Sequence, residues 1–464
     1  MRLAIDIGGT FTDLVLETGN ELLTKKVLTS ISQPELAVIE GVSELLEENN
    51  IKASDIKMII HGTTLATNAV IERKGAKTCF ITTSGFRDVL DIGYESRFDQ
   101  YDILIDKTMS LVPRKHRYVI DERTDVNGSI ITSIDKDQFC NLITKIKNEN
   151  FESIAVGFLH SYANPDNEKI LKAFLTNELP YVEVSVSSDV CPEIREYERF
   201  TTTVVNAYIK PLMSNYLKKL DQKLLNSGFN CPLLLMTSGG TLTNISSACN
   251  NPVRLVESGP AGGAILATSI AEDMNLSKVI SFDMGGTTAK ITIIENKKAI
   301  KAREFEVDRK ARFKKGSGYP LRIPVIEMVE IGAGGGSIAR VNKLDQIITG
   351  PDSAGSFPGP ACYSNGGSMP TITDADLVIG KINPDNFAGG KIKLSKQLAD
   401  KAITENILKF VNIDTNIAAL AISEIVDETM SNAARIHTVE QGHETSNRTL
   451  IAFGGAAPLH IARV

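Results

Sequence analysis

Two short stretches of the chain repeat an aspartate, two glycines and a threonine in the same order. They are LAIDIGGTFTD, from Leu3 to Asp13, and ISFDMGGTTAK, from Ile280 to Lys290. A two-glycine turn after a strand lets backbone N–H groups approach an anion closely, because no Cβ obstructs them. One copy alone is as consistent with a plain hairpin as with a phosphate site. Two copies in matching contexts indicate a pair of phosphate-binding loops.

The two loops also predict which residues would meet the ligand. Asp6 and Asp283 each lie at the end of an expected strand, where open α/β sheets place ligands. A carboxylate there holds hydrated Mg²⁺ or orients an attacking water, so we expect both to be catalytic and to bind Mg²⁺ through water. The expected phosphate contacts are Gly8, Gly9, Thr10, Thr12 and Asp13 in the first copy, and Gly285, Gly286, Thr287 and Thr288 in the second.

Two further glycine-rich stretches are candidate ligand loops. GAGGGS begins at Gly332 and contains Gly334 and Gly335, and its composition favours an anion or substrate contact over a plain linker. Gly454 and Gly455 follow another apolar run, and a glycine turn there suits packing against a flat nucleobase.

Other polar residues leave two interpretations open. His61 is either a catalytic proton carrier or phosphate donor, or a structural histidine with both nitrogens satisfied. For the charged group at the start of a long helix, an interdomain ion-pair cluster is favoured over catalysis. Two aspartates after Thr373 either bind metal or nucleotide or cap a turn. The charged group is Arg195, Glu196 and Arg199, and the aspartates are Asp374 and Asp376. The remaining histidines show no zinc-binding spacing.

The elements that must hold these residues alternate between apolar runs and helical periodicity, which is typical of an α/β fold. We expect an N-terminal domain over residues 1–200, with an insertion near 94–127, and a second domain over 201–464. Pro211 lies inside a long helical pattern, where it predicts a kink or a boundary.

Composition narrows the class of protein. The 464 residues carry a formal net charge of −6, and no basic run resembles a nucleic-acid footprint. No apolar run approaches the roughly 18 residues that a membrane helix needs. Six scattered cysteines and the lack of a signal peptide favour the cytoplasm.

The chain resembles the hydantoinase A / oxoprolinase family, a branch of the actin-like ATPase superfamily that includes subunits of ATP-dependent ketone carboxylases. The resemblance covers nearly the whole chain. It is carried by DIGGTFTD at the N-terminus, HGTTLATNAVIERKGA from His61, PEIREYERFTTTVVNAYIKPLM from Pro192, ESGPAGGA from Glu257, FDMGGTTAK from Phe282, GYPLRIPVIEMVEIGAGGGSIA from Gly318, PGPACY from Pro358, TDADLVIGKINPDNFAGG from Thr373 and FGGAAPLH from Phe453.

This resemblance implies duplicated actin-like ATPase (ribonuclease H-like) domains, with ATP and Mg²⁺ in a cleft between them and FGGAAPLH as the adenosine loop. It also implies ATP-dependent hydrolysis of a cyclic amide of the hydantoin, N-methylhydantoin or 5-oxoproline class. ATP would phosphorylate the amide carbonyl, whose resonance otherwise resists attack by water. A second large subunit of the hydantoinase B type is the implied partner.

Three alternatives remain at this stage. The chain is a ketone carboxylase subunit, a sugar or metabolite kinase, since DIGGT also opens such proteins, or a non-catalytic ATP-driven switch. Relatives usually continue well beyond FGGAAPLH, so we expect the second domain to be truncated at Val464. The substrate and the oligomeric state stay open, a homo-oligomer included.

Overall fold

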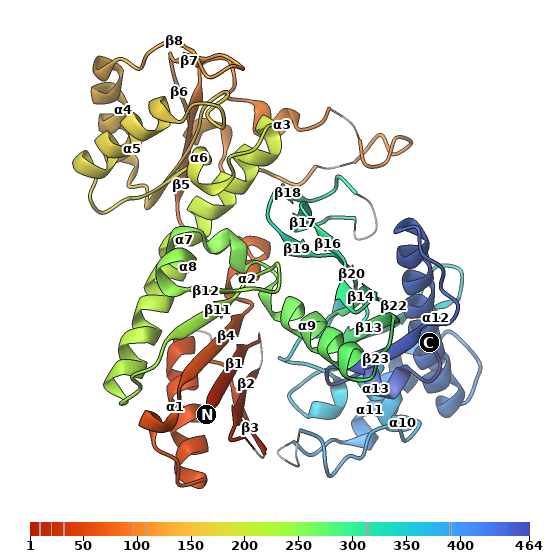
Figure 1. Ribbon diagram of the computed structural model, residues 1–464. Helices are drawn as coiled ribbons and strands as arrows, with labels where there is room; N and C mark the ends of the chain where they lie inside the picture. Colours follow the sequence, from red (N-terminus) through yellow and green to blue (C-terminus); the bar gives the residue numbers. More distant parts are fainter. Residues whose placement is uncertain are drawn as a thin grey trace. The chain divides into compact units, whose positions relative to one another are not determined.

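The computed structural model describes residues 1–8, 11–19, 21–30, 33–95, 97–105, 107–311, 315–388, 390 and 392–464. Its backbone divides into two compact units (Figure 1). Unit 1 comprises Met1–Gly262 and Lys301–Val325, and unit 2 comprises Gly263–Ile300 and Ile326–Val464. The expected boundary near residue 200 falls inside helix α7 (Glu196–Asn226), which belongs wholly to unit 1. The compact units therefore divide at a different place.

The first sheet of unit 1 is mixed and carries the first glycine turn. Its strand order is β12 (Leu242–Asn244), β11 (Leu233–Met236), β4 (Met58–Thr63), β1 (Arg2–Ile7), β2 (Phe11–Glu17) and β3 (Leu22–Leu28). Along β1, Leu3, Ile5 and Ile7 are buried while Asp6 lies on the opposite, exposed face. The buried face packs against α1 (Pro34–Glu48) and α7 in one hydrophobic cluster. Burial of alternate residues is what the period of a strand dictates.

The second sheet of unit 1 is wholly parallel, in the order β10 (Glu183–Val186), β9 (Ser153–Gly157), β5 (Thr78–Thr83) and β6 (Arg117–Ile120). Helices α4 (Lys136–Glu149) and α5 (Asp166–Glu178) pack with it in one hydrophobic cluster, and α7 packs with it in another. Helix α7 thus contacts both sheets and runs through Pro211 without ending there.

Shorter elements complete unit 1. They are α2 (Leu65–Ile71), α3 (Val89–Ile92), α6 (Ser187–Val190), α8 (Ile245–Asn250), η1 (Ala53–Asp55), η2 (Arg114–His116), η3 (Pro252–Leu255), β7 (Arg123–Thr124), β8 (Ile130–Thr132), β16 (Lys301–Ala302), β17 (Phe305–Val307), β18 (Tyr319–Leu321) and β19 (Val325–Ile326), the last of which ends at the boundary of unit 2. Helix α9 (Ser258–Asp273) carries the chain onward into unit 2.

Unit 2 is built on one mixed sheet with the order β15 (Lys298–Ala299), β14 (Ala289–Glu295), β13 (Lys278–Met284) and β23 (Thr449–Phe453), in which β20 (Met328–Ile331) also pairs with β14. Its core joins this sheet to α10 (Ile372–Val378), α11 (Lys396–Ile403) and α12 (Thr415–Glu440). The other elements are β21 (Ser337–Val341), β22 (Ile347–Ser353), η4 (Ala361–Tyr363), η5 (Thr404–Leu408) and α13 (Ala457–His460).

Each unit contains the same local topology around its glycine turn. β1 pairs antiparallel with β2 and parallel with β4, and β13 pairs antiparallel with β14 and parallel with β23. The expected α/β class is confirmed, with mixed sheets. No helix in the described part of the chain is long and apolar enough to cross a membrane.

His61 fixes β4 to α7 in the core of unit 1. Its side chain is 0% exposed; Nδ1 lies 3.2 Å from the Ile5 carbonyl oxygen and Nε2 lies 2.7 Å from the Tyr216 hydroxyl. With Nδ1 donating to the carbonyl, Nε2 accepts from the hydroxyl, so both ring nitrogens are occupied. Burial lowers the pKa of His61 to about 4, which keeps it neutral at pH 7. This geometry favours the structural alternative over the expected catalytic role.

Replacing Tyr216 with phenylalanine should therefore destabilise unit 1. The variant leaves Nε2 of His61 buried without its partner, which costs about 1–3 kcal/mol of unfolding free energy. Urea unfolding measures the change. Tyr181→Phe is the matched control, because Tyr181 is 96% exposed and its hydroxyl can meet water. Equal stability of the two variants would contradict the assignment.

Candidate functional site

The first hairpin places Asp6 near the end of β1, on the exposed face of the sheet. The Gly8 N–H donates to the Phe11 carbonyl at 2.9 Å and closes the turn. Asp13 lies directly opposite Asp6 in the antiparallel register, and its Oδ1 is 2.6 Å from Nζ of Lys26 on β3. Gly9 and Thr10, which were predicted to contact phosphate, lie outside the described residues.

The carboxylate of Asp6 packs against two glycines. A Cβ on Gly62 would lie 3.0 Å from Asp6 Oδ1, and one on Gly259 would lie 3.7 Å from it. Gly259 belongs to the first turn of α9, and Ser258 beside it donates its hydroxyl to the Thr63 carbonyl at 3.1 Å. The first N–H groups of a helix have no partner within the helix and carry a partial positive charge. The start of α9 is thus held beside Asp6.

Thr12 faces away from this surface. It is 0% exposed, on the core face of β2, and its Oγ1 lies 3.0 Å from the hydroxyl of Thr29. Thr29 in turn donates to the Gly8 carbonyl at 3.1 Å. The expected direct contact between Thr12 and phosphate does not fit this placement, because successive residues of a strand point to opposite faces. Thr12 instead supports the turn from below.

The second hairpin reproduces the first turn. The Gly285 N–H donates to the Thr288 carbonyl at 3.1 Å, as Gly8 does to Phe11. Gly286 and Thr287 are exposed at the tip, while Asp283 is half-buried on β13. Burial raises the pKa of Asp283, and the charge of Lys290 opposes that rise.

The two hairpins differ in the residue opposite the aspartate. Asp6 faces a second carboxylate, whereas Asp283 faces a lysine. Each of these opposite residues pairs with a counter-charge on the next strand. The two cross-strand rows read Gly62, Asp6, Asp13, Lys26 in unit 1 and Phe453, Asp283, Lys290, Glu330 in unit 2.

The GAGGGS loop lies directly beneath the second turn. Gly335 N–H donates to the Gly285 carbonyl at 3.1 Å, and Gly336 N–H donates to the Gly286 carbonyl at 2.7 Å. A Cβ on Gly334 would lie 2.5 Å from backbone atoms of Thr287. Gly334 and Gly335 are buried, so the expectation that they bind the ligand themselves is corrected. They instead support the second turn, which is the expected phosphate-binding loop.

The Gly454–Gly455 loop lies beside Asp283. Both glycines are exposed, and Gly454 has a φ of +87°, which favours glycine. A Cβ on Gly454 would come 2.7 Å from Asp283 Oδ1 and 2.6 Å from the Met284 carbonyl oxygen. The Ala456 N–H donates to that carbonyl at 3.0 Å. The structure thus gathers the second turn, Asp283 and the predicted nucleobase loop in unit 2.

The remaining predicted polar residues have structural roles. Arg199 is 0% exposed and donates to the carbonyls of Phe158 at 2.7 Å and Glu193 at 3.0 Å; Glu196 lies 3.8 Å away. Arg195, at a φ of +81°, precedes α7. All these residues lie within unit 1, so the expected interdomain cluster is not supported.

The two aspartates after Thr373 also act within the fold. Asp374 accepts backbone N–H groups of Cys362 at 2.7 Å and Thr371 at 2.8 Å, which confirms the capping alternative for this residue. Asp376 lies 3.0 Å from Nε2 of His460. Sequence reasoning missed His460 as a partner of Asp376 and also the start of α9, although the small residues of ESGPAGGA are a usable signal for close backbone approach.

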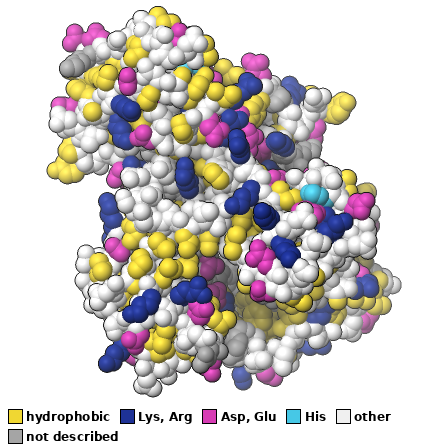
Figure 2. All heavy atoms as spheres, viewed as in Figure 1, with side chains coloured by type: hydrophobic (Ala, Val, Ile, Leu, Met, Phe, Trp, Pro, Cys, Tyr) yellow, Lys and Arg dark blue, Asp and Glu magenta, His cyan; other side chains and the backbone are white. Residues whose placement is uncertain are grey.

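The carboxylates of Asp6 in unit 1 and of Asp283 in unit 2 are each the kind of oxygen ligand that a phosphate-bound magnesium ion takes. Mg²⁺ prefers oxygen ligands, keeps several waters and needs only one or two carboxylates besides phosphate oxygens. In the described ranges, no group of three or more His, Cys, Asp or Glu side chains is arranged to hold a metal on protein ligands alone. On the face that Figure 2 shows, basic side chains are interspersed with acidic ones, which does not resemble a nucleic-acid stripe.

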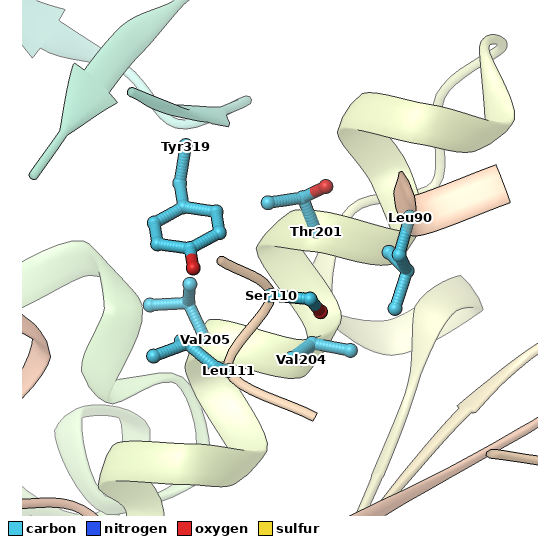
Figure 3. Close-up of a pocket in the computed structure, with 7 residues that line it drawn as sticks. All are labelled: Leu90, Ser110, Leu111, Thr201, Val204, Val205 and Tyr319. Atoms are coloured by element: carbon cyan, nitrogen blue, oxygen red, sulfur yellow. The ribbon is translucent and has the colours of Figure 1, made fainter. Parts of the chain in front are cut away.

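Two pockets in unit 1 lie apart from the hairpins. The first has a volume of about 10 Å³, too small for a metabolite, and is lined by Leu90, Ser110, Leu111, Thr201, Val204, Val205 and Tyr319 (Figure 3). The second measures about 260 Å³ and includes Lys172 and Lys210. Their ammonium groups lie 2.6 Å from Asp189 and 3.2 Å from Glu183, so each is already ion-paired.

Known proteins are similar to this chain in sequence along nearly its whole length. An uncharacterised protein of Methanocaldococcus jannaschii is 42% identical over 467 residues, covering 99% of this chain and 68% of the relative. Caprolactamase subunit alpha of Pseudomonas jessenii is 33% identical and covers 100% of this chain and 66% of the relative.

Solved structures agree. The crystal structure of the ATP-dependent caprolactamase of P. jessenii matches with a TM-score of 0.85 and 32% identity, over 100% of this chain and 67% of that one. The nucleotide-free structure of acetone carboxylase, studied for ATP-dependent acetone carboxylation, matches with a TM-score of 0.84 and 25% identity, over 99% and 66%. The chain thus spans about two thirds of the length of these relatives.

Family profiles give the same assignment. The hydantoinase/oxoprolinase profile matches residues 199–464, and the profile of the N-terminal region of the same family matches residues 2–179. The chain belongs to the hydantoinase/oxoprolinase family.

Proposed function

We propose that this chain is the ATP-binding subunit of an enzyme that hydrolyses a C–N bond of a cyclic amide. The substrate class is a hydantoin, an N-methylhydantoin or 5-oxoproline. One observation carries the proposal: the Asp6 and Asp283 hairpins share a turn hydrogen bond and a strand-end carboxylate. The similarity to an ATP-dependent caprolactamase supports the amide as substrate.

The proposal assigns each loop a task. Backbone N–H groups of the two turns and of the start of α9 bind phosphate oxygens, with Gly454 and Gly455 against the base of ATP. Asp6 and Asp283 hold Mg²⁺ through water. The ion, when bound, neutralises the charge that develops on the transferred phosphoryl group. Asp13 lies opposite Asp6 and holds the Lys26 ammonium group beside it.

The reaction is a carbonyl activation. The γ-phosphoryl group moves from ATP to the amide oxygen and leaves ADP. A first water then adds at the carbonyl carbon, the ring nitrogen leaves with a proton, and the ring opens as an acyl phosphate. A second water at the same carbon releases phosphate together with the original amide oxygen. Positioning and charge stabilisation supply the catalysis, because phosphoryl transfer asks for little covalent chemistry from the protein.

Further parts of the proposal are the duplicated actin-like ATPase (ribonuclease H-like) architecture, a cytoplasmic location and a second large subunit of the hydantoinase B type. The repeated hairpin topology supports the duplication. The name of caprolactamase subunit alpha shows that one relative works with another subunit. That relative is also longer than this chain.

The second candidate is a subunit of an ATP-dependent ketone carboxylase. The match to acetone carboxylase, with a TM-score of 0.84, and the 30% identity to an acetophenone carboxylase gamma subunit support it. A ketone would use the same phosphate loops, because activation again places the phosphoryl group on a carbonyl oxygen. The two candidates therefore differ in the substrate and not in the nucleotide site.

A substrate screen separates the candidates. We expect ATP-dependent phosphate release to rise when a hydantoin, 5-oxoproline or a lactam is offered, with this chain alone or with a co-produced second subunit. Small ketones with bicarbonate form the carboxylase arm, and hexoses form the kinase arm. Phosphate release that is stimulated only by a hexose would refute the proposal. Phosphate release that is stimulated only by a ketone with bicarbonate would support the second candidate instead.

Removing either strand-end carboxylate should abolish the stimulated reaction. We expect Asp6→Asn and Asp283→Asn each to lower amide-stimulated phosphate release about 100-fold or more, since each loses one charge that orients the metal and the phosphates. Asp273→Asn, at the exposed end of α9, is the control and should keep full activity. Full activity in Asp6→Asn or Asp283→Asn would refute the assigned roles.

Two glycine variants distinguish support from contact. Gly334→Ala places a methyl group 2.5 Å from the Thr287 backbone, so it should lower both stability and ATP affinity. Gly455→Ala meets no atom within 4 Å and should change ATP affinity alone. Thermal unfolding and calorimetric titration with ATP measure the two quantities. Normal stability and ATP affinity in Gly334→Ala would show that the loop does not hold the turn.

A further inference from the structure

A buried charge cluster lies in unit 2, apart from the glycine turn. His460 ends α13 and is 1% exposed, between two carboxylates. Its Nδ1 is 2.7 Å from Asp427 Oδ1 on α12, and its Nε2 is 3.0 Å from Asp376 Oδ2 on α10. A histidine with a carboxylate at each ring nitrogen is stabilised as the imidazolium, in which both nitrogens carry protons.

Lys381 completes the cluster. Its Nζ is 3.7 Å from Asp376 and 4.0 Å from Asp427, and it donates to the Ser423 hydroxyl at 2.8 Å. Ser423 donates to Asp376 at 3.1 Å. With His460 protonated, two cations balance two carboxylates in the interior. Arg463, which follows α13, forms an exposed ion pair with Glu424 on α12.

Helix α10 connects this cluster to the turn beside Asp283. At its start, Thr373 directs its backbone N–H and its hydroxyl to the Gly335 carbonyl, each at 2.8 Å. Gly335 in turn holds the Gly285 carbonyl. Three residues further along α10, Asp376 binds His460, and residues at this spacing are neighbours on the surface of a helix.

The charge cluster is also connected to the Gly454–Gly455 loop, through His460. His460 follows Gly454 and Gly455 by less than two helical turns of chain, and Ala457 between them is buried in the core. Fixing His460 therefore fixes the chain that follows the loop, while the hydrogen bond from the Ala456 N–H to the Met284 carbonyl holds the residue directly after the two glycines.

We infer that α10 is a strut that holds both glycine loops against Asp283, and that His460 is the positioning residue that joins the Gly454–Gly455 loop to it. The inference rests on the proposed function only where it concerns ATP. His460 does not touch the ligand in this account. It acts through the place and order of the loop that does.

The charge on His460 sets the pH range of this arrangement. Burial alone would lower the pKa of His460, but its hydrogen bonds to Asp376 and Asp427 outweigh burial and raise the pKa to about 9. The group is raised above its unfolded value of 6.5, so its stabilising effect is complete below that value and is lost as the pH rises through about 9. Above it, two buried carboxylates face a single cation.

The test compares His460→Gln with His437→Gln. His437 is a matched control, because it is also buried in unit 2 but its pKa is lowered to about 4, so it stays neutral throughout the alkaline range. Amide hydrogen exchange at pH 7 measures how often the backbone of the two loops opens, and it needs no ligand. His460→Gln should exchange about tenfold faster at residues 454–460 and also faster at 285–288, whereas His437→Gln should match the wild type there.

ATP affinity across alkaline pH gives the second readout. Wild-type affinity should fall about tenfold as the pH passes through 9, and His460→Gln should already be about tenfold weaker at pH 7 with no further fall. Unchanged exchange at both loops in His460→Gln overturns the strut, whatever happens with ATP. Faster exchange in a protein that binds no ATP supports the strut and refutes the proposed nucleotide site.

Discussion

The site in unit 2 depends on the absence of side chains at a few positions. The carboxylate of Asp283 and the turn after it are approached from two directions by peptide backbone, at Gly334 and at Gly454, and a single Cβ at either would overlap backbone atoms at 2.5–2.6 Å. Close packing of backbone on backbone fixes the turn without any side chain filling the space above it. The tip at Gly286 and Thr287 is therefore supported by backbone contacts and still exposed.

The turn of the first hairpin is held by other contacts than the turn in unit 2. Its turn is held by hydroxyl groups, from Thr12 through Thr29 to Gly8, and its aspartate packs against Gly62 and Gly259. Here the helix start at α9 adds backbone donors. The residue opposite the aspartate also changes from Asp13 to Lys290. The exchange changes the charge directly opposite each aspartate, although each row still holds two carboxylates and one lysine.

Much of this arrangement was predictable from local sequence. The apolar runs, the repeated Asp-x-Gly-Gly-Thr pattern and the helical periodicities give the strands β1 and β13 and the turns that follow them. The face of Thr12 follows from strand alternation once the turn is known to be a tight hairpin. The choice between the two interpretations of His61 was not predictable, because its partner Tyr216 lies 155 positions away. The roles of Gly334 and His460 likewise depend on contacts that only the folded chain creates. Composition alone suggested a ligand loop at GAGGGS, where the structure has a support.

The fate of the amide oxygen tests the central claim most directly. A cyclic amide that stimulates the enzyme is labelled with ¹⁸O at the carbonyl that is attacked, and the phosphate released from ATP is analysed by mass spectrometry. If ATP phosphorylates that oxygen and both waters add at carbon, the phosphate carries the label. Phosphate that contains no ¹⁸O while the ring opens would show that the amide oxygen does not leave with phosphate, and would contradict the account.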